Sequence, residues 1–547
     1  MVESAPDGPA TWLHTDRQPP AKPSYEEAVY LIRRYTLATN CVLDLFDENE
    51  LLDDLPDWLG SCSEQDPIPS MIYHLVFAIG AQTSPADRDA IAAQYFDYGR
   101  YLTASYTMED PSIATVQAYA MITHYLLGAS RRNAAFMYLG TAVRAAYALG
   151  LHRSEISEIG TSFSPPEMRN RERVWKVMRV LDLFMSASLG RPPSTAETRD
   201  TEQEVDYSAS NDLCFIFEKI LTDVYAKRMV STDTLHKISQ HHRRWTARFH
   251  KGLDNDGIAK EQFLTGGVPN IGLIYVKEAY HWTIILLTRL FFVEFVSSQI
   301  TQRSQGAEVG DSSSAHPRSS GSHQVLIHAC VNSAISTVNL LKVLLGYGDI
   351  PKRLPFIVNS LFASGLVLGL AYFGDLYKTY ALDSSLDAAI NIISLFPQDA
   401  VAKRNMTILE LLRDACSIYL KSQTDENLAR HAHLVSGMFG KVDDKFDRAS
   451  LPTTRRTCVN VSNTSDVART QIVAPHTPGP SSSDNMIAAI QSCGNMATAM
   501  AVPLFSGFGD DFGIPMPPNL SPMTLRFDPY EESVPLFSTF DARELLE

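Results

Sequence analysis

Apolar residues recur every three or four positions along most of residues 24–445, which is the spacing that one face of an α-helix presents. The pattern is regular in 112–129, 272–296 and 327–346. Alternating apolar and polar runs joined by tight Asn-Gly or Asp-Gly turns, which would indicate β-hairpins, are missing. The sequence therefore predicts an all-α fold, a large helical bundle or array.

Three segments break the helical pattern. Residues 1–23 contain five prolines and no periodicity, and a capping box at 24–27 then predicts the start of the first helix. Residues 303–323 are rich in Ser and Gly, which predicts a flexible insert within the helical domain. Residues 446–547 begin as a linker and end in an acidic tail. We expect the N-terminal segment and this C-terminal region to be disordered.

The acidic tail combines charge with aromatic residues. Residues 475–547 hold ten prolines, six phenylalanines, nine acidic residues and two basic ones, so they cannot bury enough apolar surface to offset the entropy of ordering. Phenylalanines among acidic residues suit folding onto the groove of a partner protein. The alternative is a tail without a function. The candidate contact residues are Phe505, Phe508, Phe512, Phe537 and Phe540.

Length, charge and cysteine usage narrow the class of protein. A chain of 547 residues is too long for one compact core, and a net charge of -15 argues against a surface that attracts nucleic acid everywhere. The seven cysteines are scattered, as expected of reduced thiols and not of a disulfide framework. The sequence opens without the basic start and apolar run of a secretory signal.

One apolar stretch has two interpretations. Residues 354–374 contain no charged residue and include the motif Gly365-x-x-x-Gly369, which would fit a membrane helix. Pro355, Asn359 and the serines of its first half favour a helix buried on all sides instead. We expect no membrane partner.

The stretch 137–155 is crowded with small residues. Because Gly140 and several alanines leave little bulk, other backbones could approach closely, which predicts a helix at the centre of a bundle. Gly150 predicts a left-handed cap on which Leu151 folds back. His152 would then lie near the negative end of the helix dipole.

A second helix is predicted at 164–189, with a capping box at its start and Gly190 at its end. Arg171 and Asp182 share one of its faces. We expect Arg144 of the preceding helix to form a partly buried ion pair with Asp182, the alternative being that these charges are solvated.

These two helices carry a resemblance to a known family. The sequence resembles the fungal-specific transcription factor domain, the middle regulatory region of fungal binuclear zinc cluster proteins, most sharply over 134–193. Lys176 departs from the family, which often has a second tryptophan there. The signature residues are Gly140, Arg144, Gly150, His152, Arg153, Arg171, Trp175, Asp182, Gly190, Arg191 and Pro192.

Members of this family usually read DNA through an N-terminal module in which six clustered cysteines hold two zinc ions. The cysteines of this sequence are never closer than the 21 positions between Cys41 and Cys62, so no such cluster can be formed from them. We therefore expect no cofactor here, with zinc only if a missing N-terminal cluster exists. The sequence is interpreted either as an incomplete gene product or as a regulator that does not bind DNA itself.

Two other segments carry candidate chemistry. Residues 225–251 are basic around Trp245 and predict either a phosphate-binding patch or a solvated helix face. Asp53-Asp54-x-x-Asp57 and Asp443-Asp444-x-x-Asp447 fit a magnesium–diphosphate motif of terpene cyclases, but Pro56 interrupts the first. We expect no catalytic residues and no metal ligands, and a terpene-cyclase-like enzyme is a remote alternative.

The resemblance implies a nuclear regulator of RNA polymerase II transcription, often specific to one metabolic or biosynthetic pathway. Its expected partners are promoter DNA, reached directly or through a related factor, and the transcription machinery, reached through the tail. A homodimer or heterodimer and a small-molecule effector are further expectations. The alternative is an adaptor or co-regulator that pairs with a DNA-binding relative.

Overall fold

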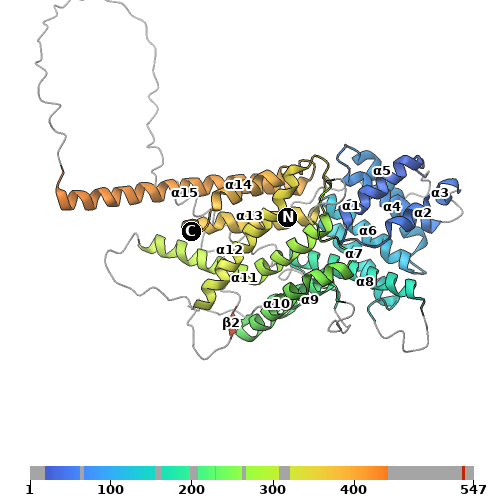
Figure 1. Ribbon diagram of the computed structural model, residues 1–547, viewed down its shortest axis with the longest axis horizontal. Coiled ribbons are helices and arrows are strands. Elements are labelled where there is room, and N and C mark those ends of the chain that lie inside the picture. The colour runs from blue at the N-terminus through green and yellow to red at the C-terminus, as the bar shows by residue number, and fades with distance from the viewer. Residues whose placement is uncertain are drawn as a thin grey trace, which may run out of the picture. The chain divides into compact units, whose positions relative to one another are not determined.

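The architecture was obtained as a computed structural model, which describes residues 19–61, 67–153, 163–196, 207–227, 229–261, 267–306, 321–441 and 533–535. Most of these residues are helical and strands are almost absent among them, so the predicted all-α fold is confirmed (Figure 1). The chain divides into one unit of residues 1–413 with 495–547 and a second of residues 414–494. The five candidate phenylalanines of the tail and the motif at Asp443 lie outside the described residues.

The helices of the first half are short to medium in length. They are α1 (Tyr25–Thr39), α2 (Glu48–Asp53), α3 (Leu55–Gly60), α4 (Pro67–Thr83), α5 (Asp89–Tyr106), α6 (Ile113–Gly128), α7 (Arg132–Ala148), α8 (Pro165–Leu189) and α9 (Ala209–Lys219). α9 continues as a π-helical segment, η3 (Ile220–Tyr225).

The second half contains longer helices. They are α10 (Thr232–Asn255), α11 (Ile271–Gly306), α12 (Gly321–Leu341), α13 (Pro355–Phe373), α14 (Leu382–Ile393) and α15 (Ala400–Phe439), with short 3₁₀ turns η4 (Lys342–Gly346) and η5 (Leu376–Lys378). Both ends of the expected flexible insert, 303–323, are helical instead, because α11 continues to Gly306 and α12 begins at Gly321. Residues 307–320 lie outside the described part of the chain.

One small sheet joins distant parts of the sequence. Strand β1 (Met229–Ser231) pairs antiparallel with β2 (Ser533–Pro535), and Val230 lies opposite Val534.

The first core forms where α1, α4, α5 and α6 pack together. α4 is buried around almost its whole circumference, which explains why its sequence lacks a polar face. Gly80 makes the crossing with α1 possible, because a Cβ atom at this position would collide with the backbone carbonyl of Leu31. The helix predicted to begin at Ser24 does so, and the Ser24 side chain accepts a hydrogen bond from the Glu27 amide at 3.3 Å.

The second core surrounds α13, which packs against α11, α12 and α14 (Figure 1). Gly365 and Gly369 face Leu409 and Leu412 of α15, and a Cβ at Gly365 would lie 2.7 Å from the Leu409 side chain. The interpretation of 354–374 as a fully packed helix is thus supported, with 83% of its most apolar window buried. By length and composition three described helices could cross a membrane, at 271–303, 323–346 and 355–373.

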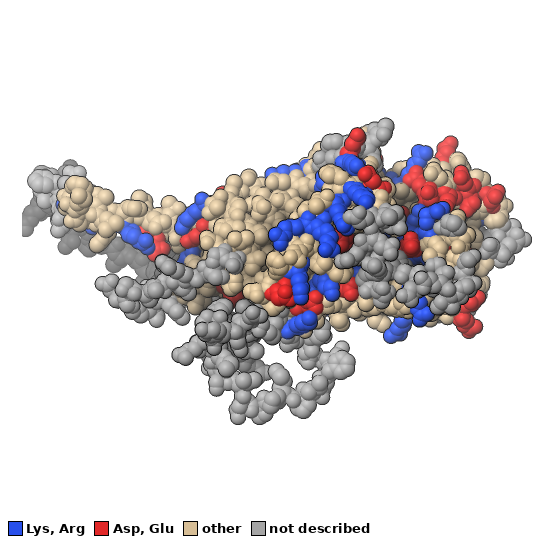
Figure 2. Space-filling model, turned by 60° about the horizontal axis from the view of Figure 1, so that its bottom comes forward, with Lys and Arg blue, Asp and Glu red and all other residues tan. Residues whose placement is uncertain are grey.

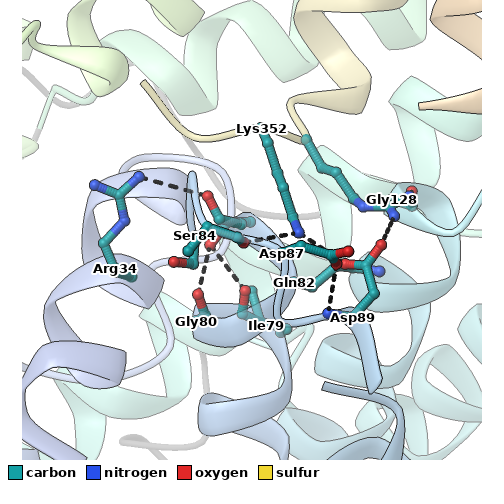
Figure 3. A network of polar contacts seen from close by, with 12 residues as sticks. Arg34, Ile79, Gly80, Gln82, Ser84, Asp87, Asp89, Gly128 and Lys352 are labelled. Carbon is teal, nitrogen blue, oxygen red and sulfur yellow. Dashed lines mark hydrogen bonds and ion pairs between the residues drawn. The ribbon is translucent and has the colours of Figure 1, made fainter. Parts of the chain in front are cut away.

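A polar network connects the two cores (Figure 3). The Lys352 amide donates to the Thr83 carbonyl at 3.1 Å, and the Lys352 ammonium pairs with Asp89 at 2.9 Å. Arg353 pairs with the other oxygen of Asp89 at 2.6 Å and donates to the Gly128 carbonyl at 2.9 Å. Asp89 at the start of α5 therefore holds the segment that leads into α13.

Candidate functional site

Two of the three signature glycines end helices. Gly150 has φ 67°, and the Leu151 amide donates to the Ala146 carbonyl at 2.9 Å, which closes α7 with a left-handed glycine. Gly190 has the same φ of 67°, and the Arg191 amide donates to the Ser186 carbonyl at 3.1 Å. Both predicted caps are confirmed. The capping box predicted at the start of α8 is wrong, because Ser164 occupies the N-cap position but makes no capping side-chain hydrogen bond.

Two signature arginines, Arg171 of α8 and Arg191 just after α8, contact the two ends of α7. Arg171 donates from Nη2 to the Leu149 carbonyl at 2.7 Å, so it satisfies a carbonyl at the C-terminal end of α7. Arg191 donates to the Asn133 side chain at 2.6 Å and lies 4.3 Å from the centre of the Phe136 ring, in the first turns of α7. We refer to the contacts of α7 with α8 and residues 190–195 as the α7–α8 junction.

Aromatic side chains fill the junction near the end of α7. Tyr147 contacts His152 edge-on at 4.8 Å between ring centres and Trp175 at 5.5 Å, and His152 lies 6.1 Å from Trp175. Trp175 is buried. His152 thus packs between rings, whereas Arg153 is exposed. Lys176, the departure from the family, pairs with Asp256 at 2.8 Å and joins α8 to the end of α10.

Asp182 is fully buried and orders the loop after α8. Its Oδ2 accepts hydrogen bonds from the Ser194 amide at 2.8 Å, the Thr195 amide at 2.7 Å and the Thr195 hydroxyl at 2.8 Å. Burial raises the pKa of Asp182, although these bonds and the charge of Arg179 oppose the shift. The expected ion pair with Arg144 is wrong, because Arg144 is exposed on α7 and Asp182 faces the loop that Pro192 and its neighbours form.

The prediction that α7 lies at the centre of the bundle is also wrong. One face, formed by Leu139, Val143 and Ala146, is buried against α6 and α8, but Ala148 and Arg144 are exposed. A Cβ at Gly140 would meet no atom of the described residues within 4 Å. The small residues Gly140 and Ala148 therefore do not reflect the close approach of another backbone. The signature residues instead cap the helices, form hydrogen bonds through Arg171 and Arg191, and pack one face of α7.

A cavity of about 60 Å³ lies where α8, α9, α11 and α13 meet beside the residues that follow α1. Its wall is formed mainly by aliphatic and aromatic side chains, with Phe184, Phe217, Trp282 and Phe356 among them. Glu278 of α11 also lines it and is only 3% exposed. Sequence reasoning missed this site. Glu278 gives no distinct signal in the sequence, because α11 also carries Lys277, Arg289 and Glu294, and the walls come together only in the folded chain.

The basic segment 225–251 lies mostly in α10, which the end of η3 and strand β1 precede. Figure 2 shows Lys and Arg side chains gathered in the middle of one face, with Asp and Glu side chains among them. Lys227 pairs with Asp223 at 2.8 Å and Lys237 with Asp233 at 2.6 Å. Trp245 is turned inward, donates to the Ala209 carbonyl at 2.8 Å and stacks on Tyr280. No base could stack on Trp245, which favours the solvated helix face.

The structure does not assemble the diphosphate motif at residues 53–57. Asp53 ends α2 and Leu55 begins α3, so the three carboxylates do not share a continuous helix. His241 and His242 point apart, with His242 bonded to the Ile238 carbonyl and Thr283. Within the described residues no group of three His, Cys, Asp or Glu side chains could hold a metal ion.

Comparison with known proteins gives the class of the domain. Residues 33–222 match the model of the fungal specific transcription factor domain. This segment contains the C-terminal part of α1, then α2 through α9, and therefore the whole α7–α8 junction. Residues 33–222 are thus a fungal specific transcription factor domain, as the signature residues predicted.

Curated relatives are similar to part of this chain. Transcription factor asqA of Emericella nidulans is 32% identical over 124 residues, which cover 22% of this chain and 21% of the relative. The acetamidase regulatory protein of Aspergillus oryzae is 32% identical over 131 residues, covering 23% and 16%. The ABC-transporter-regulating transcription factor of the same organism is 24% identical over 179 residues, covering 31% and 20%. The similarity thus spans about a fifth of these relatives. No solved structure matches significantly.

Proposed function

We propose that this protein regulates RNA polymerase II transcription in the nucleus, on the genes of one metabolic or biosynthetic pathway. The observation that carries the proposal is the match of residues 33–222 to the fungal specific transcription factor domain. The relatives named for transcription or regulation agree with it. In this proposal the domain has no catalytic role and takes up no cofactor of its own.

The proposal gives the chain two kinds of partner. Promoter DNA is reached either directly or through a related factor, and the chain acts as a homodimer or heterodimer. The related factor is considered because the sequence offers no cysteine cluster for zinc. The acidic tail, through Phe505, Phe508, Phe512, Phe537 and Phe540, contacts the transcription machinery. The inward position of Trp245 and the acidic partners of Lys227 and Lys237 favour contact with DNA elsewhere than on α10.

Chromatin immunoprecipitation of the tagged full chain tests the proposal. We expect enrichment at a limited set of promoters and altered transcript levels of the adjacent genes when the gene is deleted. The enriched fragments are then mixed with the purified chain. Binding of the chain alone indicates direct recognition, and binding only with a co-purifying factor indicates an adaptor. A uniform chromatin profile together with unchanged transcripts would contradict the proposed function.

A further inference from the structure

The wall of the cavity joins two parts of the chain. α8, α9 and the residues after α1 belong to the matched domain, whereas α11 and α13 lie beyond it. Four aromatic rings meet here. Phe184 lies 5.4 Å from Trp282 and 3.7 Å from Phe356 between ring centres, and Phe217 contacts Trp282 edge-on at 5.3 Å. Such a surface favours apolar groups and offers few partners to a polar one.

Glu278 is the exception in this wall. Burial raises the pKa of its carboxyl to about 8, although a hydrogen bond with Ser360 of α13 acts in the opposite direction. At neutral pH the group is therefore mostly an uncharged carboxylic acid. A protonated carboxyl carries one O–H donor, which an ionised carboxylate lacks.

The other polar groups around the cavity are already engaged or uncharged. The Ser210 hydroxyl donates to Asp256 at 2.8 Å, and Asp256 in turn pairs with Lys176. Tyr275 donates to the Ala38 carbonyl at 3.4 Å, and burial raises its pKa well above 10.

Two thiols complete the titratable groups of the wall, Cys41 after α1 and Cys214 on α9. Burial raises the pKa of Cys41 to about 12. α8 and α13 contribute only apolar side chains to the wall itself. Among Glu278, Tyr275 and Cys41, Glu278 is therefore the group whose charge changes near neutral pH.

We propose that this cavity binds a small uncharged apolar molecule whose carbonyl or ether oxygen accepts a hydrogen bond from the carboxyl group of Glu278. A volume of 60 Å³ is below half of the roughly 150 Å³ of an apolar cavity that admits benzene, so the cavity encloses about two or three non-hydrogen atoms of the ligand, a carbonyl or ether oxygen with its neighbouring carbons. An ammonium group would bring three donors into a wall with few acceptors and would lose its hydration.

Binding would couple the matched domain to the helices beyond it, because the ligand contacts both. A ligand that binds only this packed arrangement stabilises it by mass action and shifts the chain toward it. This consequence rests on the proposed function, since it describes how an effector would act on a regulator. Binding itself does not depend on that function.

The test uses the full chain labelled with 5-fluorotryptophan, which gives five fluorine signals for five tryptophans. Trp282→Phe identifies the signal of the cavity. The probes are 2-butanone, which carries a carbonyl oxygen, and sec-butylamine, which carries an ammonium group. We expect 2-butanone to shift the Trp282 signal in a saturable manner at pH 7. Its affinity should fall up to about tenfold by pH 9, because the protonated fraction of Glu278 falls by that factor.

Two substitutions separate the hydrogen bond from the apolar contacts. Glu278→Gln keeps an N–H donor at every pH, so 2-butanone should still bind but without the loss between pH 7 and 9. Glu278→Leu removes the donor and keeps an apolar wall, and it should weaken binding about tenfold at pH 7, the worth of one hydrogen bond. Both variants replace a buried acid by an uncharged group and are expected to fold.

Three results would overturn the inference. The first is a Trp282 signal that neither probe changes. The second is equal 2-butanone affinity in Glu278→Leu and the parent chain, which would leave an apolar cavity without a recognition group. The third is tighter binding of sec-butylamine that grows above pH 8, which would make the cavity a cation site. None of these results would bear on promoter occupancy, so the proposed function is tested separately.

Discussion

Arg171 of α8 donates a hydrogen bond from Nη2 to the backbone carbonyl of Leu149 at 2.7 Å, at the point where α7 ends. Helix C-termini leave carbonyl groups without partners inside the helix, and a buried one costs free energy if nothing satisfies it. The place of Arg171 in the family signature is thus explained by its hydrogen bond to the end of α7. The same holds for Gly150 and Gly190, whose left-handed conformation ends α7 and α8.

Replacing Arg171 should therefore destabilise the domain. We expect Arg171→Ala to lower the free energy of unfolding by about 1–3 kcal/mol, since a charged donor is lost and the Leu149 carbonyl is left without it. Denaturant titration followed by circular dichroism measures the change. Arg144→Ala is the matched control, because Arg144 is a signature arginine that is exposed, and it should stay within about 0.5 kcal/mol of the parent. Equal effects of the two substitutions would contradict the role of Arg171.

Two helix glycines should respond in opposite directions to the same substitution. A Cβ at Gly140 meets open space, so Gly140→Ala should stabilise the chain by about 0.5–1 kcal/mol through helix propensity. A Cβ at Gly80 collides with the Leu31 backbone, so Gly80→Ala should destabilise it by about 1–3 kcal/mol. Melting temperatures of both variants decide the matter. A lower melting temperature for Gly140→Ala would contradict the open position of Gly140 and would indicate that α7 is a central helix.

Asp89 should be important for the connection between the two cores. Asp89→Ala removes the partner of Lys352 and Arg353, both largely buried, and should cost about 2 kcal/mol. Burial raises the pKa of Asp89, but the hydrogen bonds and charges of Lys352 and Arg353 outweigh it and lower the pKa overall.

The pH dependence follows from that direction. A lowered folded-state pKa means that the stabilisation by Asp89 is present above the unfolded pKa near 4 and is lost as the pH falls below it. The parent chain and Asp89→Ala should thus converge in stability in acid. The exposed Asp110→Ala serves as the control and should have little effect. A stability difference for Asp89→Ala that is constant down to pH 3 would argue against the network.

Glu278 should make the chain less stable as the pH rises, which is the opposite of the pH dependence expected from Asp89. Its pKa in the folded chain is about 8, whereas an unfolded glutamate titrates near 4.5. Between these values the folded chain holds a proton that the unfolded chain has released, so stability should fall by about 1.4 kcal/mol per pH unit as the pH rises. Glu278→Gln should remove this slope. Glu294→Gln, an exposed position of the same helix, should leave it unchanged. Unfolding measured at pH 5, 6, 7 and 8 would show it.

The sequence predicted those features that depend on local patterns. Helical periodicity gave the all-α class, and Gly150 and Gly190 marked real helix ends because a left-handed residue favours glycine. The paired signature in 134–193 led to the family, which the match of residues 33–222 confirms. These inferences needed only neighbours within a few turns of chain.

What failed depends on contacts between distant residues. The small side chains of α7 suggested a buried centre, yet Gly140 faces open space. Arg144 and Asp182 suggested an ion pair, but Arg144 is exposed and Oδ2 of Asp182 instead accepts hydrogen bonds from Ser194 and Thr195 of the loop after α8. The cavity at Glu278 combines walls from four helices that are far apart in the sequence, so no local pattern could reveal it.

The most direct measurement of the central claim, that this chain regulates transcription, is a tethered reporter assay. The full chain and residues 475–547 alone are each fused to an unrelated DNA-binding domain upstream of a reporter gene. We expect the full chain to change reporter output and the tail alone to raise it, with a marked decrease when Phe505, Phe508, Phe512, Phe537 and Phe540 are replaced by alanine. Unchanged output from both fusions, with normal expression and nuclear location, would contradict the account.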